Sequence, residues 1–440
     1  MTVRHSRVLS TGKTALCLLP FCFFSVVCPP ALAWEQTGAT LGARLDEAMQ
    51  NLLKSYNVPG GALAVGYKGK LVFARGYGFA DVEKRIPYKS TTITCLASVT
   101  KTVTALALLK LAEEGKLSLD QTLYESLGKP PLPDVSQDAP VKKITIRQLL
   151  HHSGGWRRGI FYDWKMLQNM SGGRPVDLEK FLVQVMRRPL DYEPGSEAHY
   201  SNFQYGVLNL VVEHASGTTY ENYVQSHILH PLGITDMRRE AIHGNYVEGE
   251  ARRYDSRRQK VLPGGRPDYP LSGPMGSWIA SAEDLVRLLT AIDGTKKPAI
   301  LNQDSITEMF AAPAPPMTPR PNGTYFGIGW DVVTPAANLS QRQYSKNGGV
   351  AGIHSLIEHR AGDIDVALLF NGNGYLDTSE DADPNVESNA NSNLNTNSNT
   401  TAKLFGKARK TINLILDNNS DWPQTDLFEQ VQTRMPTPDP

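Results

Sequence analysis

The sequence predicts a single α+β domain in which both ends of the chain contribute to one antiparallel sheet, with flanking helices and a mainly helical insert. Near the N-terminal end, two strand-like runs at 62–67 and 71–77 are separated by Lys-Gly-Lys, which is typical of a hairpin. Extended runs return late in the chain, at 326–333, 353–359 and 365–370. Because helical periodicity dominates between these two sets of strands, we expect them to share one sheet across a helical insert.

The composition is that of an ordinary globular protein. The 440 residues carry a net charge of +1 and are 40% hydrophobic, and they contain no basic block or stripe. Nucleic-acid binding therefore lacks its usual electrostatic signature, and no nucleic-acid partner is expected.

The first 33 residues have the pattern of a signal peptide. Basic residues stand before an apolar run at 14–27, and Ala31-Leu32-Ala33 is the small-x-small pattern of a cleavage site. The run is too short for a membrane-spanning helix, and Pro20 interrupts it. We therefore expect an exported protein, periplasmic or secreted, with no transmembrane segment after cleavage. An uncleaved membrane anchor and lipid attachment at Cys28 are weaker alternatives.

The remaining elements follow from apolar periodicity and capping residues. A helix over 41–56 has apolar residues at helical spacing and stops before Gly60-Gly61. The segment from Cys95 to Gly115 is apolar nearly all round, which predicts a buried helix that ends at Gly115. A helix over 282–292 begins after Ser281, a good N-cap. Further helices are predicted at 144–150, 178–186, 203–215, 220–229 and 403–416.

We expect one domain at 34–425, with its sheet at about 41–95 and 325–416 and its helical part at about 96–324. Within it, residues 377–401 are mostly Asn, Ser, Thr and Asp. Such a segment cannot build a core, so it predicts a disordered surface loop. Residues 426–440 are expected to form a flexible tail.

Ser98 and Lys101 stand at the start of the buried helix, three residues apart. Residues at i and i+3 share a helix face, so both side chains are expected to point into the same space. A serine hydroxyl becomes a nucleophile when a neighbouring base removes its proton, and a lysine is such a base if burial and nearby positive charge lower its pKa. The start of a helix also favours the neutral amine and stabilises an oxyanion.

The same Ser-x-x-Lys spacing occurs at Ser10–Lys13 in the leader and at Ser126–Lys129 in a Gly/Pro-rich loop. Only Ser98 opens a buried helix, and this context favours it over the other two. Cys95 lies three residues before Ser98, and we interpret it as a small buried hydrophobe rather than a nucleophile. Because the other cysteines lie in the leader, no intramolecular disulfide is expected.

Two further groups of residues carry chemistry. Tyr200-Ser201-Asn202 lies in a polar loop before a helix, where the phenol can relay protons to Lys101 and the asparagine can orient the lysine or hold a substrate carbonyl. Tyr220-Glu221-Asn222 has the same spacing and is interpreted as structural. Lys346-Asn347-Gly348-Gly349 precedes a late strand, where glycines let a substrate approach the backbone and the lysine adds positive charge. A plain glycine-rich turn is the alternative.

The order and separation of Ser-x-x-Lys, Tyr-x-Asn and Lys-x-Gly resemble the penicillin-recognising serine hydrolases. That family includes class C β-lactamases, D-Ala-D-Ala carboxypeptidases, aminopeptidases and esterases. The likeness extends over about 41–374 and includes the stretches KITIRQLLHHSGG, HPLGITDM and SWIASAEDLVRLLTA. It implies a β-lactamase/transpeptidase-like fold, a small-molecule or peptide substrate, and no metal or other cofactor.

The resemblance also implies a role for each matching residue. Ser98 would be the acylated nucleophile, and Lys101 and Tyr200 would share general base and acid duty as a coupled pair. The N–H groups of Ser98 and Gly349 would form the oxyanion hole. The implied substrate- and oxyanion-binding positions are Asn202, which orients the pair, Lys346, which adds positive potential, and Gly348 and Gly349.

One position departs from the β-lactamase pattern. Asn347 stands where Thr or Ser commonly lies between the Lys and the Gly and binds the carboxylate of the antibiotic. This departure disfavours efficient β-lactam hydrolysis and leaves peptidase and esterase activity open. The sequence therefore predicts an exported serine hydrolase that cleaves an amide or ester bond through a Ser98 acyl-enzyme, with D-amino-acid peptides or esters as the favoured substrates.

Other functions fit less well. A β-lactamase proper and a catalytically silent penicillin-binding sensor or scaffold are alternatives, although a silent scaffold has no need for the lysine. An α/β-hydrolase would carry a Gly-x-Ser-x-Gly elbow, which the sequence lacks. A metallohydrolase is disfavoured because the adjacent His151-His152 are interpreted as a structural loop feature. In the loop that follows, Trp156, Tyr162 and Trp164 either line a substrate cleft or pack a seam.

Overall fold

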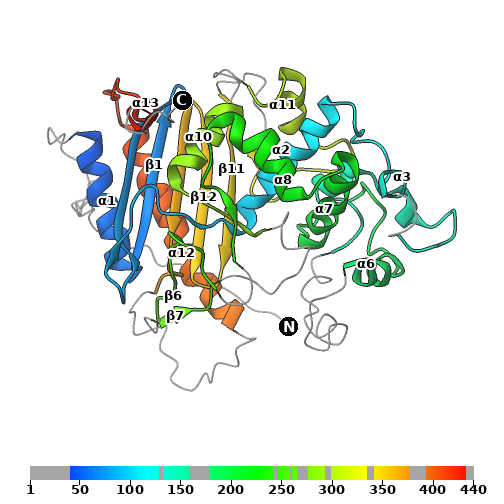
Figure 1. Ribbon diagram of the computed structural model, residues 1–440, viewed down its shortest axis with the longest axis horizontal. Coiled ribbons are helices and arrows are strands. Elements are labelled where there is room, and N and C mark those ends of the chain that lie inside the picture. Colours follow the sequence, from blue (N-terminus) through cyan, green and yellow to red (C-terminus); the bar gives the residue numbers. More distant parts are fainter. Residues whose placement is uncertain are drawn as a thin grey trace, which may run out of the picture. The chain divides into compact units, whose positions relative to one another are not determined.

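An antiparallel sheet assembled from both ends of the chain forms the centre of the fold (Figure 1). The computed structural model describes residues 40–127, 132–157, 178–241, 245–257, 260–264, 276–292, 299–333, 341–375 and 393–432. Within these residues the sheet has eight strands, in the order β3-β2-β1-β13-β12-β11-β10-β9. They are β1 (Gly60–Tyr67), β2 (Lys70–Asp81), β3 (Ile86–Pro87), β9 (Thr324–Phe326), β10 (Asp331–Val333), β11 (Tyr344–Val350), β12 (Ile353–Arg360) and β13 (Ile364–Phe370). The predicted α+β class and the sheet shared by both chain ends are confirmed.

Strands β1 and β13 join the two ends of the chain. They pair in antiparallel register, with Leu63 opposite Leu368 and Val65 opposite Val366. Strands β1 and β2 form the predicted hairpin, and its turn includes Gly69 with a φ of 75°, a conformation that glycine adopts without steric cost.

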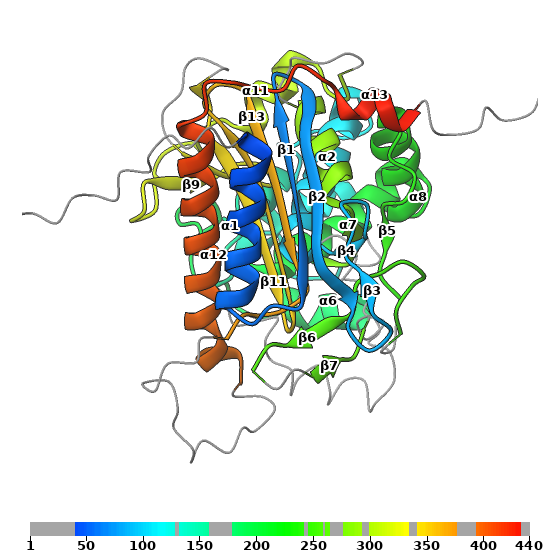
Figure 2. The same cartoon turned by 90° about the vertical axis from the view of Figure 1, so that its left-hand side faces the viewer.

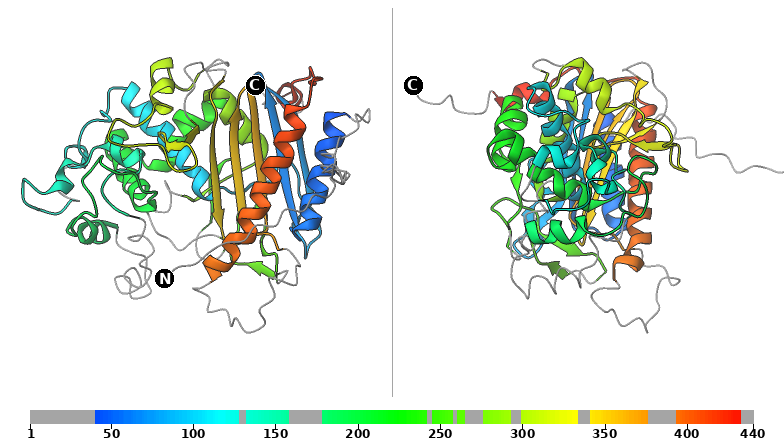
Figure 3. Two further views of the ribbon diagram at one scale, coloured as in Figure 1. Left: turned by 180° about the vertical axis from the view of Figure 1, so that it is seen from behind. Right: turned by 90° about the vertical axis from the view of Figure 1, so that its right-hand side faces the viewer.

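Helices cover both faces of the sheet (Figures 2 and 3). On one face, α1 (Leu41–Ser55) and α12 (Asn393–Asp417) lie side by side and enclose a core that contains Leu63 and Val65. On the other face, α10 (Ala282–Ile292) packs on β1 and β13 over a core that contains Ala62 and Ala64. This alternation along β1 follows from the two-residue period of a strand.

Helix α2 (Thr100–Glu113) belongs to the second core and is buried on nearly all sides, as its composition predicted. It follows a 3₁₀ turn at Ala97–Val99 and ends before Gly115, whose φ is 68°. The 3₁₀ turn packs on β11 and β12, whereas the helix packs on α7 (Asn202–Ser216) and α8 (Tyr220–Val224). The start of α2 therefore lies at the junction of the sheet and the helical part.

The insert is mainly helical, as predicted, but it also contains short strands that were not predicted. Runs of two or three residues are too short to show the period of a strand in the sequence. Its other helices in the described residues are α3 (Leu123–Leu127), α4 (Ile146–Leu150), α6 (Leu178–Met186) and α11 (Gln303–Met309), with a π-helical turn at Gln225–Leu229 and 3₁₀ turns at Pro140–Lys143 and His230–Leu232. Its short strands in the described residues are β5 (Arg238–Arg239), β6 (Arg253–Asp255), β7 (Lys260–Leu262) and β8 (Trp278–Ala280). A further short strand, β4 (Thr94–Cys95), lies just before the insert and pairs with β8.

The single strand predicted at 326–333 is wrong, because this segment is the turn and second half of the hairpin β9–β10. The turn contains Gly329, whose φ is 85°. A Cβ at this position would lie 2.6 Å from Ala105 Cβ of α2. The chain reverses here because glycine permits both the backbone conformation and the close approach to α2.

The disordered loop predicted at 377–401 is wrong for residues 393–401, which form the first turns of α12. The remainder of that loop lies outside the described residues. Asn, Ser and Thr are weak helix formers, but adding residues to an existing helix is far easier than starting one. The helix predicted at 403–416 packs on the sheet through Leu404, Ala408 and Ile412, and this packing sustains the extension.

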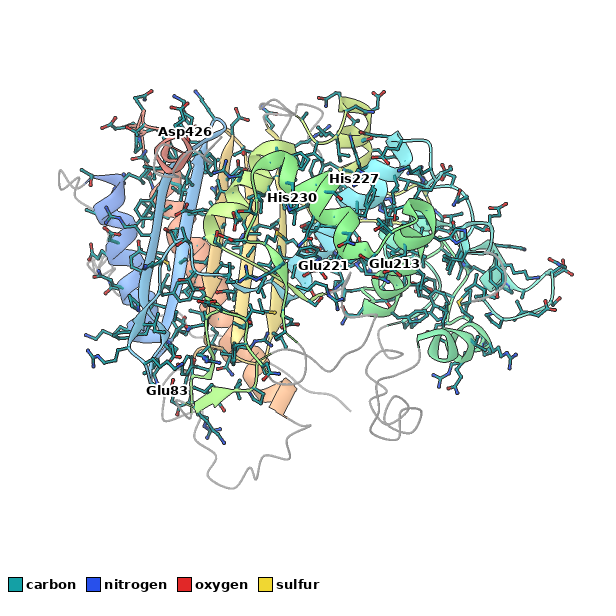
Figure 4. All side chains as sticks on the ribbon, in the orientation of Figure 1. Glu83, Glu213, Glu221, His227, His230 and Asp426 are labelled. Atoms are coloured by element: carbon teal, nitrogen blue, oxygen red, sulfur yellow. The ribbon has the colours of Figure 1, made fainter. Side chains whose placement is uncertain are left out.

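The flexible tail predicted at 426–440 is wrong for residues 427–432, which form α13 (Leu427–Gln432). Asp426, labelled in Figure 4, accepts hydrogen bonds from the N–H groups of Leu71 and Phe428 at 3.1 Å and 3.0 Å. The Phe428 ring is buried and lies 4.1 Å from the guanidinium of Arg287 on α10. One cap and one apolar side chain therefore attach this segment to β2 and α10.

From Thr40 onward the chain forms one compact unit. The segment before it, including the predicted signal peptide, lies outside the described residues. In the described part of the chain, no helix combines the length and the apolar character needed to cross a bilayer.

Candidate active site

The backbone around Ser98 is held between the small sheet β4-β8-β5 and the main sheet. The N–H of Leu96 donates to the carbonyl of Trp278 at 2.8 Å. From the other side, the hydroxyl of Ser355 on β12 donates to the carbonyl of Leu96 at 2.7 Å. Ala97 between these contacts has a φ of 45°, a costly conformation for a residue other than glycine and one that clusters at functional sites. Ser98 therefore stands on a strained turn that its surroundings impose.

Lys101 reaches Ser98 from one turn further along the helix. Its Nζ lies 3.3 Å from Ser98 Oγ and donates to Asn202 Oδ1 at 2.9 Å. The lysine side chain is fully buried. Its Nζ also lies 5.1 Å and 5.7 Å from the ring centroids of Tyr200 and Tyr205. The helical spacing predicts the contact of Lys101 with Ser98. The packing of α7 against α2 supplies the contacts of Lys101 with Asn202 and the two tyrosines.

Tyr200 approaches Ser98 from the segment that leads into α7. Its phenol donates to Ser98 Oγ at 2.6 Å. Asn202, which contacts Lys101, is the first residue of α7. The serine hydroxyl thus has an amine and a phenol within reach, and either group is able to take up or return its proton.

Lys346 on β11 also lies near Tyr200. Its Nζ is 5.3 Å from the Tyr200 ring centroid and 3.7 Å from Asp331 Oδ2. Burial lowers the pKa of Lys346, and the charge of Asp331 partly opposes this shift. Asp331 Oδ1 in turn accepts a hydrogen bond from Arg320 at 2.6 Å. A carboxylate shared by two cations therefore borders this side of the site.

Gly348 allows β11 to lie directly against the Ser98 turn. A Cβ at Gly348 would lie 2.1 Å from the carbonyl oxygen of Leu96, 2.5 Å from Ser355 Oγ and 2.9 Å from the amide nitrogen of Ser98. No side chain fits in that space. Gly349 follows Gly348 along β11, so the backbone of this strand runs beside the amide nitrogen of Ser98.

With this geometry in place, comparison with known proteins assigns the family. The family model for Beta-lactamase matches residues 45–390. The chain belongs to the β-lactamase family. Its members are serine hydrolases, and the resemblance inferred from the three motifs is confirmed.

The chain is similar to curated proteins that carry different names within the β-lactamase family. Esterase EstB of Burkholderia gladioli is 34% identical over 212 residues, which cover 46% of this chain and 53% of that protein. Protein flp of Staphylococcus aureus strain MW2 is 30% identical over 189 residues, which cover 43% of this chain and 36% of that protein. The chain thus spans about half, or less, of the curated relatives it matches. The octameric penicillin-binding protein homologue from Pyrococcus abyssi has a similar structure, with a TM-score of 0.61 at 25% identity over 76% of this chain and 74% of that one.

The structure of this β-lactamase-family protein brings all the predicted site residues together. Side chains of the first two motifs meet at Ser98 Oγ and Lys101 Nζ, and Lys346 of the third motif lies near the Tyr200 ring. The backbone of Gly348 runs beside the amide nitrogen of Ser98. These residues come from the 3₁₀ turn and first turn of α2, from the segment that leads into α7 and from β11, which adjoin only in the folded chain. The residues concerned are Ser98, Lys101, Tyr200, Asn202, Lys346, Gly348 and Gly349.

The competing motifs have other contacts. The Tyr220 hydroxyl is buried between Thr104 and the indole nitrogen of Trp278, and Figure 4 shows its neighbour Glu221 on α8. Ser126 Oγ donates to the carbonyl of Thr122, and its motif partner Lys129 lies outside the described residues.

Trp156 is fully buried with its ring against Phe203, so it packs a seam and lines no cleft. Tyr162 and Trp164 lie outside the described residues. Cys95 is fully buried, as interpreted.

The sequence analysis missed Asp331, and it interpreted His152 only as part of a structural loop feature. Asp331 reaches Lys346 because β10 pairs with β11 and places Asp331 opposite Ser345, a register that local sequence does not reveal. His152 is buried with its ring centroid 4.7 Å from that of Tyr200, whereas the ring of His151 is bonded to the carbonyl of Phe326. The two histidines therefore contact different residues. The only sequence signal for them was the stretch KITIRQLLHHSGG, which belongs to the family resemblance.

Replacing Gly348 by alanine is expected to lower hydrolysis by about 10²-fold, because the added methyl group displaces the Ser98 turn from β11. Overpacking of this kind also costs about 1–3 kcal/mol of unfolding free energy. Enzyme assays with thermal unfolding measure both effects. Gly406→Ala on α12 is the matched control, since a Cβ there meets open space. Equal activity of Gly348→Ala and the unsubstituted protein would contradict the close approach.

Proposed function

We propose that this protein hydrolyses an amide or ester bond through an acyl-enzyme on Ser98. The observation that carries the proposal is the position of Ser98 Oγ, 2.6 Å from the Tyr200 hydroxyl and 3.3 Å from Lys101 Nζ, with the lysine fully buried. Burial in general disfavours a charged ammonium, which is the condition that a lysine needs to accept a proton. A protein that only binds its ligand has no need for a buried amine at this position.

The reaction divides into two halves. Ser98 Oγ attacks the substrate carbonyl carbon while its proton passes to the coupled pair of Lys101 and Tyr200. The N–H groups of Ser98 and Gly349 donate hydrogen bonds to the oxyanion that forms. The pair then returns a proton to the departing amine or alcohol, which leaves an ester on Ser98. A water molecule attacks this ester with the same proton carriers, and its hydrolysis releases the acid and restores the serine hydroxyl.

D-amino-acid peptides or esters are the substrates we favour over β-lactams. Asn347 is exposed on β11 beside Lys346, at the position where the β-lactamase pattern commonly has a shorter hydroxyl side chain. Its flat amide is longer than Thr or Ser and presents a different geometry to a β-lactam carboxylate. The similarity to EstB, which is named as an esterase, supports the ester arm of the proposal.

Four substrates compared side by side test the proposal: a D-Ala-D-Ala peptide, a D-amino-acid amide, a short-chain nitrophenyl ester and a cephalosporin. We expect turnover of the ester and of at least one D-amino-acid substrate. The kcat/KM for the cephalosporin is expected to be lower by roughly 10²-fold, because its carboxylate lacks a fitted partner at Asn347. Mass spectrometry after incubation with a fluorescent penicillin should place the adduct on Ser98.

Each contrary result has its own meaning. A kcat/KM that is highest for the cephalosporin would identify a β-lactamase proper. An adduct on Ser98 without turnover of any substrate would identify a silent penicillin-binding sensor. The absence of both adduct and turnover would refute the enzymatic proposal.

A further inference from the structure

We infer that His152 is a positioning residue that holds Tyr200 against Ser98. The inference rests on the proposed acyl-enzyme function and concerns what keeps its proton carrier in place. His152 follows α4 and lies in none of the three motifs that meet at the site.

The backbone of His152 is bonded to the segment that precedes Tyr200. Its carbonyl oxygen accepts hydrogen bonds from the N–H of His199 at 2.9 Å and from the hydroxyl of Tyr192 at 3.2 Å. His152 has a φ of 59°, a left-handed conformation that few residues other than glycine adopt. Strained residues of this kind persist where the surrounding structure imposes them, and they cluster at functional sites.

The ring of His152 contacts the same segment. The N–H of Ser201 donates to His152 Nδ1 at 3.2 Å. Because a backbone N–H only donates, this bond requires an unprotonated Nδ1. The ring centroid lies 4.7 Å from that of Tyr200 and 4.9 Å from that of Phe326. His152 thus bonds the residues before and after Tyr200 and contacts the phenol ring itself.

Burial, together with nearby positive charge, keeps this ring neutral. Burial lowers the pKa of His152 well below its usual value, and the positive charge of Lys346 acts in the same direction. His151 and Arg320 contribute smaller shifts of the same sign. A neutral ring accepts the Ser201 hydrogen bond and adds no further cation beside Lys346.

The segment that His152 holds carries two contacts of the site. Tyr200 donates to Ser98 Oγ, and Asn202, two residues later, accepts from Lys101. A misplacement of about 1 Å in such an array costs on the order of 10²-fold in rate. Loss of the Ser201 hydrogen bond is therefore expected to slow acylation rather than to weaken substrate binding.

Substitutions at His152, with His151 as the matched control, test this inference. His152→Asn keeps a hydrogen-bond acceptor on a side chain that tolerates a positive φ, whereas His152→Phe keeps a ring and lacks the acceptor. His152→Gly relieves the backbone strain without supplying an acceptor, and it replaces His152→Phe if that variant does not fold. His151 is also buried, but its Nδ1 is bonded to the carbonyl of Phe326 at 2.7 Å.

Single-turnover acylation by the nitrophenyl ester separates the acylation rate constant from the dissociation constant of the substrate. We expect His152→Phe to lower the rate constant by about 10²-fold with the dissociation constant nearly unchanged. His152→Asn should recover most of the loss. His151→Phe and His151→Asn should lower the melting temperature and leave the acylation rate constant near that of the unsubstituted protein.

Amide hydrogen exchange at Ser201 gives a second readout that does not depend on activity. Exchange should be faster in His152→Phe and His152→Gly than in His152→Asn. Three results would each overturn the inference. The first is an acylation rate constant in His152→Phe equal to that of the unsubstituted protein, and the second is a loss of that rate constant in the His151 variants as large as in His152→Phe. The third is a Ser201 amide exchange rate that is the same in His152→Phe, His152→Gly and His152→Asn. A protein that shows this exchange pattern but forms no Ser98 adduct would refute only the proposed function.

Discussion

Replacing Ser98 by alanine is expected to abolish the covalent adduct with a fluorescent penicillin and to lower ester hydrolysis by about 10³-fold or more. The substitution removes the oxygen that forms the acyl ester, and the Tyr200 phenol then has no hydroxyl to exchange a proton with at this position. Ser98 is half-buried, and alanine has no larger side chain, so the melting temperature should change little. Mass spectrometry of the intact protein and steady-state kinetics measure the two effects.

Ser126→Ala is the matched control for this substitution, because Ser126 opens another Ser-x-x-Lys match. Its hydroxyl donates to the carbonyl of Thr122 at 2.9 Å and accepts from Gln121 at 2.6 Å. Its loss should lower the unfolding free energy by about 1 kcal/mol and leave hydrolysis unchanged. Full hydrolysis by Ser98→Ala would exclude the acyl-enzyme and require a different nucleophile.

Replacing Lys101 by methionine is expected to lower the acylation rate constant by roughly 10²–10⁴-fold, the usual contribution of a positioned base. Methionine is also long and unbranched, so it fills the space of the buried stem without burying an amine. The unfolding free energy should therefore stay level or rise. Stopped-flow acylation and chemical denaturation measure the two quantities.

Lys101→Arg distinguishes a base from a positive charge. A guanidinium stays protonated, so this variant should be as slow as Lys101→Met if Lys101 accepts the serine proton. Lys110→Met is a control on the same helix, where the ammonium is bonded to Glu113 and to the carbonyl of Ile300. It should acylate normally. Normal acylation by Lys101→Arg would show that residue 101 acts through charge alone.

Local patterns were sufficient for much of the fold. The apolar run after Ser98 predicted a buried helix, and the three-residue spacing predicted that Lys101 shares its face, since both signals depend only on helix geometry. Boundaries were less predictable. Helix α12 begins at Asn393 within a stretch of weak helix formers, because its later turns are anchored on the sheet. Similarly, α13 depends on Phe428 having a site beneath Arg287.

The nucleophile, its neighbouring amine and the class of fold could be read from residue types and short spacings. The contact between Tyr200 and Ser98 could not be predicted in this way. The two residues are 102 positions apart, and only the packing of α7 on α2 makes them neighbours. Resemblance to known hydrolases pointed to that contact, but no local rule did. Asp331 gave no such signal, because its contact with Lys346 depends on a strand register. His152 gave only a weak one, its place in the stretch KITIRQLLHHSGG, because its contacts depend on a strained loop. Contacts within one helical turn follow from the spacing of residues along the sequence. Contacts between distant segments form only when the packed core fixes the positions of the helices and strands relative to one another.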